Sequence, residues 1–577
     1  MSLFRTIATL GLIVVFTPFA QADEEAAAIE KRLADSARYL ASDELGGRGM
    51  GTDGLALAAD YIAEQFEQAG LETELFDGTA MQKFRVATSA EVGPGNVLKL
   101  IGPSAGDDQE PQTIELDAAE AFSPLAVSGT GSFDLSLVFV GYGITAKEEE
   151  YDDYADVDVE GKAVVMLCHE PQQSDADSPF NGKKNSPYAS LERKVATAKQ
   201  HGAAAVVLCN DRHELFKKIE PARQKWQQTL DWLAAEHEKF KQVESPTLEQ
   251  VEAQRQRIEE LTGYLEKSSE SLALRIDPIV PFDSAGQGRT PLDFPVVFCR
   301  REALDKVLRS AANIDLEELE RQIDEGPTPH SQPLPDWHVA GTVDIQREQV
   351  DVRNVVALLP GKGPMADEII VVGAHYDHVG IARERAKDKD TQEEVVHNGA
   401  DDNASGTAVM LEIARSLANR PEKLGRSIVF IAFTCEETGL LGSRHYIEHP
   451  LLPLDKTIVM LNLDMVGRLR DNKLTATRIE SAAEFSDLLD RSNCRIGLDV
   501  VKKKGSAGAS DQISFRSKNI PAMHFYTGTH EDYHRPGDDF EKLNISGMRR
   551  IGNLVEKMII ALANAEDRPQ FIESPSK

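Results

Sequence analysis

Short apolar segments alternate with amphipathic segments between residues 350 and 565. The apolar segments are rich in β-branched side chains, as buried strands are, and they occupy residues 368–374, 427–434, 457–463 and 520–526. Residues 403–420 and 439–449, which lie between them, are typical of helices. This alternation predicts an α/β domain with a mostly parallel central sheet over residues 346–565, followed by a C-terminal tail, 566–577.

The pattern changes between residues 95 and 345. Residues 135–143 and 162–170 are strand-like, and residues 191–210 predict a helix followed by a strand. No cluster of histidines, cysteines and carboxylates at ligand spacing occurs here, so we expect an accessory domain. Residues 23–94 contain a helical stretch, a glycine-rich loop at 41–54 and an amphipathic helix at 55–70. The loop lacks the Lys-Ser/Thr of a P-loop, which favours a simple connection between helices.

Residues 212–270 form a distinct segment inside the accessory region. Apolar side chains recur there at spacings of three and four on both sides of a break at Ser245–Thr247. This predicts two amphipathic helices in an antiparallel hairpin. We expect each apolar stripe to pack on the other helix; dimerisation and gating of a substrate site are the alternatives.

The N-terminal residues have the pattern expected of an export signal. Arg5 precedes an apolar stretch from Ile7 to Ala20, and Ala20-Gln21-Ala22 is a small-x-small cleavage site. We therefore expect residues 1–22 to be a secretory signal peptide, with a retained anchor as the alternative. Cleavage would leave an exported protein, periplasmic or secreted, without stable membrane insertion.

Charge and cysteine content narrow the possible partners. The 63 basic and 95 acidic side chains give a net charge of −32, which argues against nucleic acid and anionic membranes as partners. The five cysteines form no CxxC pair, so we expect free thiols rather than a disulfide framework. Two carboxylates beside Cys435 would raise its thiol pKa, which argues against a nucleophilic role.

Side chains that bind metals follow the predicted strands of the 346–565 region. They are His375, Asp377 and His378, then Asp401 and Asp402, then Glu436 and Glu437, then Asp464, and finally His530 and His534. Because ligands bind outside the carboxyl ends of the strands in open α/β sheets, these groups should meet at one edge. Repeated placement at that edge predicts a metal site.

The residue types favour zinc, with manganese or cobalt as alternatives, because imidazoles and carboxylates are present without thiolates. His375, Asp401, Glu437, Asp464 and His534 suffice for two ions if one carboxylate bridges them. Two ions about 3.5–4 Å apart can share a hydroxide. Glu436 would then be free to act as the general base.

Five motifs carry a family resemblance: GAHYDH at 373–378, GADDNASG at 399–406, CEETGLLGS at 435–443, NLDM at 462–465 and DYHRPGD at 532–538. Together with the 41–54 loop, they resemble the co-catalytic dizinc aminopeptidases, a family that also contains glutamate carboxypeptidase. The 95–345 region is similar to the protease-associated (PA) domain inserted in many members. The resemblance implies a three-layer αβα zinc-exopeptidase domain with an inserted β-rich PA domain.

The resemblance also assigns residues. It implies that His375 and Asp464 bind one zinc, that Glu437 and His534 bind the other, and that Asp401 bridges. It makes Glu436 the general base and Asp377 the carboxylate that orients His375. It further implies a cis Asp401–Asp402 bond and places Asp511 near the site. His378 and His530 are expected to line the site rather than to bind metal, and Asp402 is expected to support the ligands rather than to be one of them.

The function that follows is an exported aminopeptidase that removes N-terminal residues from peptides. Three alternatives stay open: a carboxypeptidase of the same fold, a glutaminyl cyclase with one zinc, and a receptor-like binding protein without activity. The carboxypeptidase needs a cationic pocket, for which Arg444, Arg468 and Arg470 are the candidates.

Overall fold

The structure is a computed structural model that describes residues 18–104, 110–173, 175–182, 184–275, 277–286, 291–326, 328–385, 392–505 and 508–572. The chain divides into two compact units. Unit 1 comprises the chain up to Val86 and from Val350 onward, and unit 2 comprises Ala87–Gln349. Unit 2 is therefore inserted into unit 1. Its limits are Ala87 and Gln349, where the sequence predicted 95 and 345.

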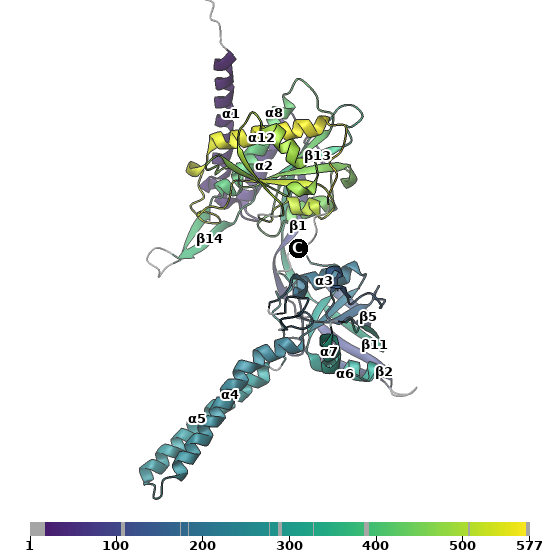
Figure 1. The fold of residues 1–577 in the computed structure, drawn as a ribbon, viewed down its shortest axis with the longest axis vertical. Coiled ribbons are helices and arrows are strands. Elements are labelled where there is room, and N and C mark those ends of the chain that lie inside the picture. The colour runs from purple at the N-terminus through teal and green to yellow at the C-terminus, as the bar shows by residue number, and fades with distance from the viewer. Residues whose placement is uncertain are drawn as a thin grey trace, which may run out of the picture. The chain divides into compact units, whose positions relative to one another are not determined.

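Unit 1 is built on a mixed eight-stranded sheet (Figure 1). Its order is β1 (Met81–Val92), β12 (Ile345–Leu359), β16 (Ser427–Phe433), β13 (Ile369–His375), β17 (Thr457–Leu463), β20 (Ala522–Tyr526), β18 (Lys473–Thr477) and β19 (Asp499–Lys503). The central strands β16, β13, β17 and β20 are parallel neighbours. These four strands are the ones that the apolar segments predicted. A separate hairpin pairs β14 (Gly380–Arg385) with β15 (Gln392–His397).

Helices cover both faces of this sheet. They are α1 (Pro18–Leu40), α2 (Asp53–Ala69), α8 (Gly406–Ala418), α9 (Leu441–Glu448), α10 (Phe485–Asn493), α11 (Gln512–Arg516) and α12 (Ile545–Asn564). Side chains alternate along β13, so Ile370 and Val372 face the core formed with α1, α2, α8 and α12. Ile369 and Val371 face the opposite core, formed with α9 and α11. Unit 1 is thus a three-layer αβα domain, as predicted.

Unit 2 contains a second eight-stranded sheet. Its order is β3 (Pro111–Leu116), β2 (Val97–Ser104), β11 (Gln332–Val343), β5 (Gly131–Phe139), β8 (Ala163–Leu167), β9 (Ala205–Cys209), β10 (Val296–Cys299) and β4 (Phe122–Pro124), and a small ribbon pairs β6 (Thr145–Ala146) with β7 (Tyr151–Asp152). The helices that pack against this sheet include α3 (Leu191–Gln200), α6 (Arg301–Ala312) and α7 (Leu316–Glu325). Val164 faces the core on the α3 side, and Val165 faces the core formed with α6 and α7.

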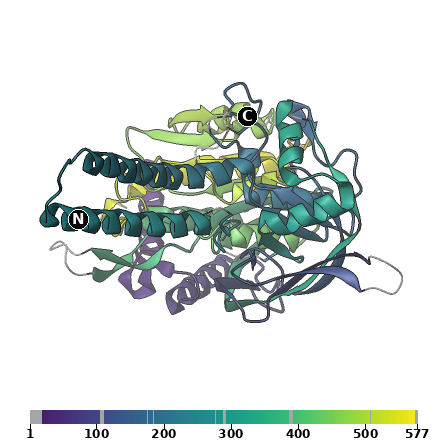
Figure 2. The same cartoon turned by 90° about the horizontal axis from the view of Figure 1, so that it is seen from below.

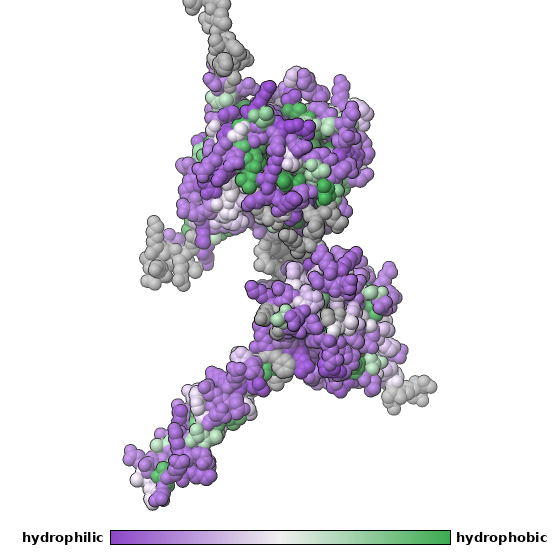
Figure 3. Space-filling view, in the orientation of Figure 1, coloured by the Kyte–Doolittle hydropathy of each residue, from purple (hydrophilic) through white to green (hydrophobic). Residues whose placement is uncertain are grey.

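The predicted helical hairpin is present in unit 2. Helices α4 (Arg212–Lys241) and α5 (Leu248–Arg275) run side by side (Figures 1 and 2). Leu261 is 2% exposed between them, whereas Trp232 and Tyr264 are more than half exposed. Figure 3 shows the visible face of the hairpin as mostly hydrophilic with some hydrophobic side chains. The stripe is thus only partly covered by the partner helix.

The structure also bears on the predictions for the cysteines and for the N-terminus. Four cysteines are buried and Cys494 is exposed, and none of the five forms a disulfide. Most of the predicted signal peptide lies outside the described residues, and the predicted cleavage site falls within α1. Among the helices that the structure describes, none combines the length and the apolar character of a membrane span.

Candidate metal centre

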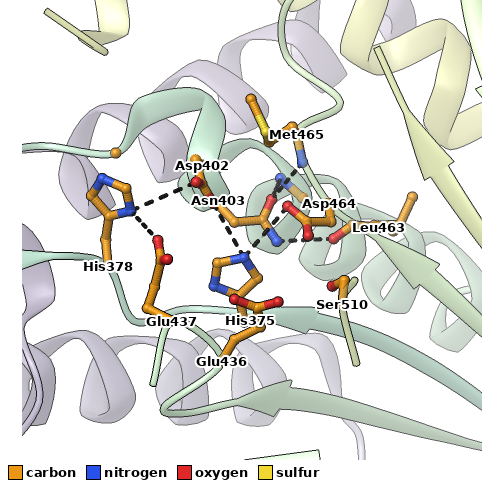
Figure 4. Close-up of polar contacts among 12 residues, drawn as sticks. His375, His378, Asp402, Asn403, Glu436, Glu437, Leu463, Asp464, Met465 and Ser510 are labelled. Atoms are coloured by element: carbon orange, nitrogen blue, oxygen red, sulfur yellow. Dashed lines mark hydrogen bonds and ion pairs between the residues drawn. The ribbon is translucent and has the colours of Figure 1, made fainter. Parts of the chain in front are cut away.

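The strand ends of unit 1 converge as the sequence predicted. His375 is the last residue of β13, Asp464 directly follows β17, and Glu436 and Glu437 lie just beyond the end of β16. Asp402 lies in an irregular helical turn, Ala400–Ser405, that precedes α8. Figure 4 shows these side chains pointing toward one another.

Two groups of side chains there have the composition and spacing of metal sites. The first is His375, Asp402 and Asp464, and the second is His378, Asp402, Glu437 and His534; within each, the ligand atoms lie within 4.8 Å of one another. His375 Nε2 lies 3.2 Å from Asp402 Oδ1 and 3.4 Å from Asp464 Oδ1. His534 Nε2 lies 3.1 Å from Asp402 Oδ2 and 3.0 Å from Glu437 Oε2. The two oxygens of Asp402 therefore serve different groups, which is the arrangement of a bridging carboxylate.

The expectation that Asp401 bridges is wrong. Its Oδ1 accepts hydrogen bonds from the backbone N–H of Gly467 and from the Ser405 hydroxyl, and its Oδ2 lies 3.2 Å from His530 Nε2. The side chain points away from both groups because neighbouring residues of the turn project in different directions. The cis peptide bond is likewise Asp402–Asn403 rather than Asp401–Asp402.

Asp377 supports the site in two ways. Its backbone carbonyl oxygen lies 3.2 Å from His375 Nδ1, whereas its carboxylate, which was predicted to orient that ring, lies farther away, at 3.6 Å. The same carboxylate accepts hydrogen bonds from the backbone N–H groups of Glu436, at 3.1 Å, and Glu437, at 3.3 Å. Asp377 thus fixes the backbone that carries both glutamates.

Two histidines and two acids complete the surroundings. His378 Nδ1 lies 2.7 Å from Glu437 Oε1, which places this ring among the side chains of the second group. His530 contacts Asp401 instead. Asp538, which sequence reasoning missed, accepts hydrogen bonds from the backbone N–H groups of Asp401 and Asp402, at 2.9 and 3.0 Å. Asp511 is fully buried, and burial raises its pKa to about 7.

The donor set fits divalent cations. Asp464 Oδ1 and His534 Nε2 are buried atoms that find no hydrogen-bond partner among the described residues. Each of them lies within 4.8 Å of the other possible ligand atoms of its group, a spacing that a shared metal ion would allow. Burial raises the pKa of Glu436 well above its usual value, and the carboxylates of Asp464, Asp511 and Glu437 add to this, while His375 opposes it. Such crowding of carboxylates is relieved by bound cations.

A buried arginine ties the glycine-rich loop to the site. Arg48 ends the short helix η1 (Asp43–Arg48) and is 0% exposed. Its guanidinium donates to four carbonyl oxygens, those of Leu40, Tyr376, Asn398 and Gly399. Burial lowers its pKa to about 10, and nearby Asp377 and Asp402 oppose that shift. The 41–54 segment therefore stabilises the chain segments beside the metal centre through Arg48, consistent with its interpretation as a connection between helices.

A cavity of about 490 Å³ opens at the metal centre. Asp402, Glu436 and Asp464 form one part of its lining, and Tyr533 contributes to another. The Tyr533 ring stacks on His534 at 3.9 Å between centroids. Tyr533 was not among the predicted residues, although it adjoins a predicted ligand.

Fold and site together define an α/β domain that carries a candidate metal centre and an inserted accessory domain. Residues 354–559 match the model of peptidase family M28, and residues 133–235 match that of the PA domain. The larger matched segment lies within unit 1 and carries the candidate metal centre, so this part of the chain is similar to peptidase family M28, and the matched segment of unit 2 is similar to the PA domain.

Individual relatives are aminopeptidases. The chain is 31% identical over 235 residues to aminopeptidase YwaD of Bacillus subtilis (strain 168), an alignment covering 39% of this chain and 48% of that protein. It is 26% identical over 226 residues to a probable leucine aminopeptidase of Arthroderma otae, covering 37% of this chain and 57% of that protein. The alignments thus span about half the length of these relatives. Among solved structures, an aminopeptidase from Aneurinibacillus sp. strain AM-1 matches with a TM-score of 0.43 and 20% identity, covering 95% of this chain and 96% of that one.

Proposed function

We propose that this protein is an exported, zinc-dependent aminopeptidase that hydrolyses the first peptide bond of peptides. The observation that carries the proposal is the position of Asp402, whose two carboxylate oxygens face two separate sets of metal-binding side chains. His375 and Asp464 complete one set, and Glu437 and His534 complete the other. We expect two zinc ions, since the donor atoms are imidazole nitrogens and carboxylate oxygens. When bound, such ions polarise a carbonyl oxygen and lower the pKa of water.

The proton transfer falls to Glu436. Its carboxylate lines the cavity beside Asp402 and Asp464, but it belongs to neither metal-binding group. It is therefore free to take a proton from the attacking water and to pass it to the leaving amine. Asp377 holds the Glu436–Glu437 backbone in place, so one residue serves as base while its neighbour serves as ligand.

The free amino terminus distinguishes this proposal from a carboxypeptidase. A carboxypeptidase needs a cation for the terminal carboxylate. The three candidate arginines do not line the cavity, although Lys503 does, so the choice rests on the relatives and on the paired substrates described below. Arg468 forms ion pairs with Asp532 and Asp538, and Arg470 donates to the carbonyl oxygens of Gly528 and Thr529. The relatives named as aminopeptidases support the same choice. Export rests on the predicted signal peptide, residues 1–22.

The experiment combines zinc analysis with paired substrates. Zinc-loaded protein should contain two ions and hydrolyse leucyl-p-nitroanilide, while N-acetylation of that substrate should abolish turnover. A C-terminal amide on a peptide should leave turnover intact. Hydrolysis that requires a free C-terminus would instead indicate a carboxypeptidase. If the zinc-loaded protein cleaves none of these substrates, the proposed peptidase activity is refuted.

A further inference from the structure

One wall of the cavity is a polar sheet face. Thr475 and Thr477 of β18 pair in register with Tyr526 and His524 of β20, and Thr477 also pairs with Lys503 of β19. Because side chains alternate along strands, these five share one face. The intervening residues Leu474, Ala476 and Phe525 lie in the hydrophobic core on the other face. Thr475, Lys503, His524 and Tyr526 all line the cavity that begins at the metal centre.

A buried histidine on this wall keeps one unpaired nitrogen. His524 is 2% exposed and interacts with the backbone of Asp464, which can satisfy only one of its two ring nitrogens; the other finds no partner among the described residues. Buried polar groups are normally hydrogen-bonded, so an unpaired ring nitrogen on a residue that lines the cavity indicates a polar ligand.

The charge of that ligand follows from Lys503. Among the described residues that line the cavity, Lys503 is the only lysine or arginine, and it forms no ion pair or hydrogen bond with any residue that the structure describes. Asp402 and Asp464, two of the three acids that line the cavity, belong to the metal-binding groups, where bound cations would offset their charge, and the third is the proposed base Glu436. The wall thus offers one ammonium group beside an unpaired ring nitrogen, which is the complement of a carboxylate.

We propose that this wall binds a carboxylate of the substrate, namely the side chain of an N-terminal aspartate or glutamate, with Lys503 as the specificity-determining residue. This inference rests on the proposed aminopeptidase function. A substrate whose reacting carbonyl lies beside Glu436 carries its first side chain on the same residue, so that side chain enters the cavity. Lys503 supplies the charge, and His524 and the Thr475 hydroxyl, which also line the cavity, supply neutral hydrogen bonds.

Isosteric substrates test the charge directly. In the zinc-loaded full-length protein, kcat/KM for glutamyl-p-nitroanilide should exceed that for glutaminyl-p-nitroanilide. Lys503→Met should lower the glutamyl value about 10- to 100-fold, the worth of one hydrogen bond to a charged group. The glutaminyl and leucyl values should change less than about two-fold by the same reasoning. Lys503→Glu should shift the preference toward lysyl-p-nitroanilide.

Lys502→Met is the matched control. Lys502 is the preceding residue on β19, but it points to the other face, where it pairs with Asp490 at 2.7 Å and donates to Ser486. Its removal should leave every substrate ratio unchanged. The inference would be overturned if Lys503→Met lowered kcat/KM equally for all substrates, or if the unmodified protein showed no preference for the glutamyl substrate. In either case, continued hydrolysis of leucyl-p-nitroanilide would still support the proposed aminopeptidase function.

The second source of a carboxylate is the C-terminus of a short peptide. Leu-Leu and Leu-Leu-amide separate it, because only the former carries a free carboxylate beyond the first residue. A Lys503→Met loss confined to Leu-Leu would overturn the assignment to the first side chain. If no anilide or peptide is cleaved by zinc-loaded protein, the proposed function itself fails.

Discussion

At the residue scale, the chemistry depends on adjacent carboxylates that have different neighbours. Glu437 approaches His378 and His534, whereas Glu436 lies in the cavity and joins neither metal-binding group. Asp377 anchors the backbone N–H groups of both. The two glutamates therefore occupy fixed and different places, although their side chains are chemically alike.

Glutamine substitutions should separate these two roles. Glu436→Gln keeps nearly the same volume but cannot accept a proton at neutral pH, so kcat should fall by about 10²–10⁴-fold while zinc content stays near two ions. Glu437→Gln should lower zinc content, because a neutral amide is a poor substitute for a carboxylate ligand. Zinc analysis and anilide kinetics on both variants decide between them. The opposite pattern would exchange the two roles.

The sequence could locate the site but could not choose between neighbouring residues. Placement of His375, Asp464 and the glutamates follows from strand ends, which hydrophobic patterning predicts well. The choice between Asp401 and Asp402 depends on backbone torsions of the Ala400–Ser405 turn, which no side-chain pattern encodes. The contact between His378 and Glu437 could not be predicted for a similar reason, since the direction of the His378 side chain depends on the chain path after β13.

At the element scale, the glycine-rich 41–54 segment acts through its backbone path. Gly47 has a φ of 67°, and a Cβ there would lie 2.4 Å from the carbonyl oxygen of His397. Only glycine allows that close approach. This path places the Arg48 guanidinium where it donates to the carbonyl oxygens of Tyr376 and Asn398, so it connects η1 to the two chain segments beside the metal centre. Sequence alone offered no signal for this, because arginines are rarely buried.

Arg48→Met should destabilise unit 1 by about 3–5 kcal/mol, because it leaves buried carbonyl oxygens without donors. Arg48→Lys should restore only part of this loss, since an ammonium has three donors in place of five. Calorimetric unfolding measures the effect. Arg85→Met is the control: Arg85 is exposed in its ion pair with Asp351, so less than about 1 kcal/mol is expected. Equal effects of Arg48→Met and Arg85→Met on the free energy of unfolding would refute this stabilising role of Arg48.

At the scale of the whole molecule, the insertion separates the chemistry from the accessory domain. Each unit has its own sheet and its own cores on both sheet faces. All the proposed metal ligands lie in unit 1, whereas all three tryptophans of the chain, Trp226, Trp232 and Trp337, lie in unit 2. Tryptophan fluorescence therefore reports on unit 2 alone, and calorimetry reports on both units.

Metal removal should consequently act on one unit. Ions that bind only the folded state stabilise it by about 4 kcal/mol at a thousand-fold excess over Kd. Chelation also leaves the carboxylates of Asp402, Glu436, Glu437 and Asp464 crowded in one place without counter-charge. We expect the calorimetric transition of unit 1 to fall by roughly 10 °C, and zinc, but not magnesium, to restore it. The midpoint followed by tryptophan fluorescence should stay unchanged, because unit 2 contributes no ligand. A fluorescence midpoint that falls with the calorimetric one would show that the units unfold together, and no shift in either would show that these side chains hold no metal.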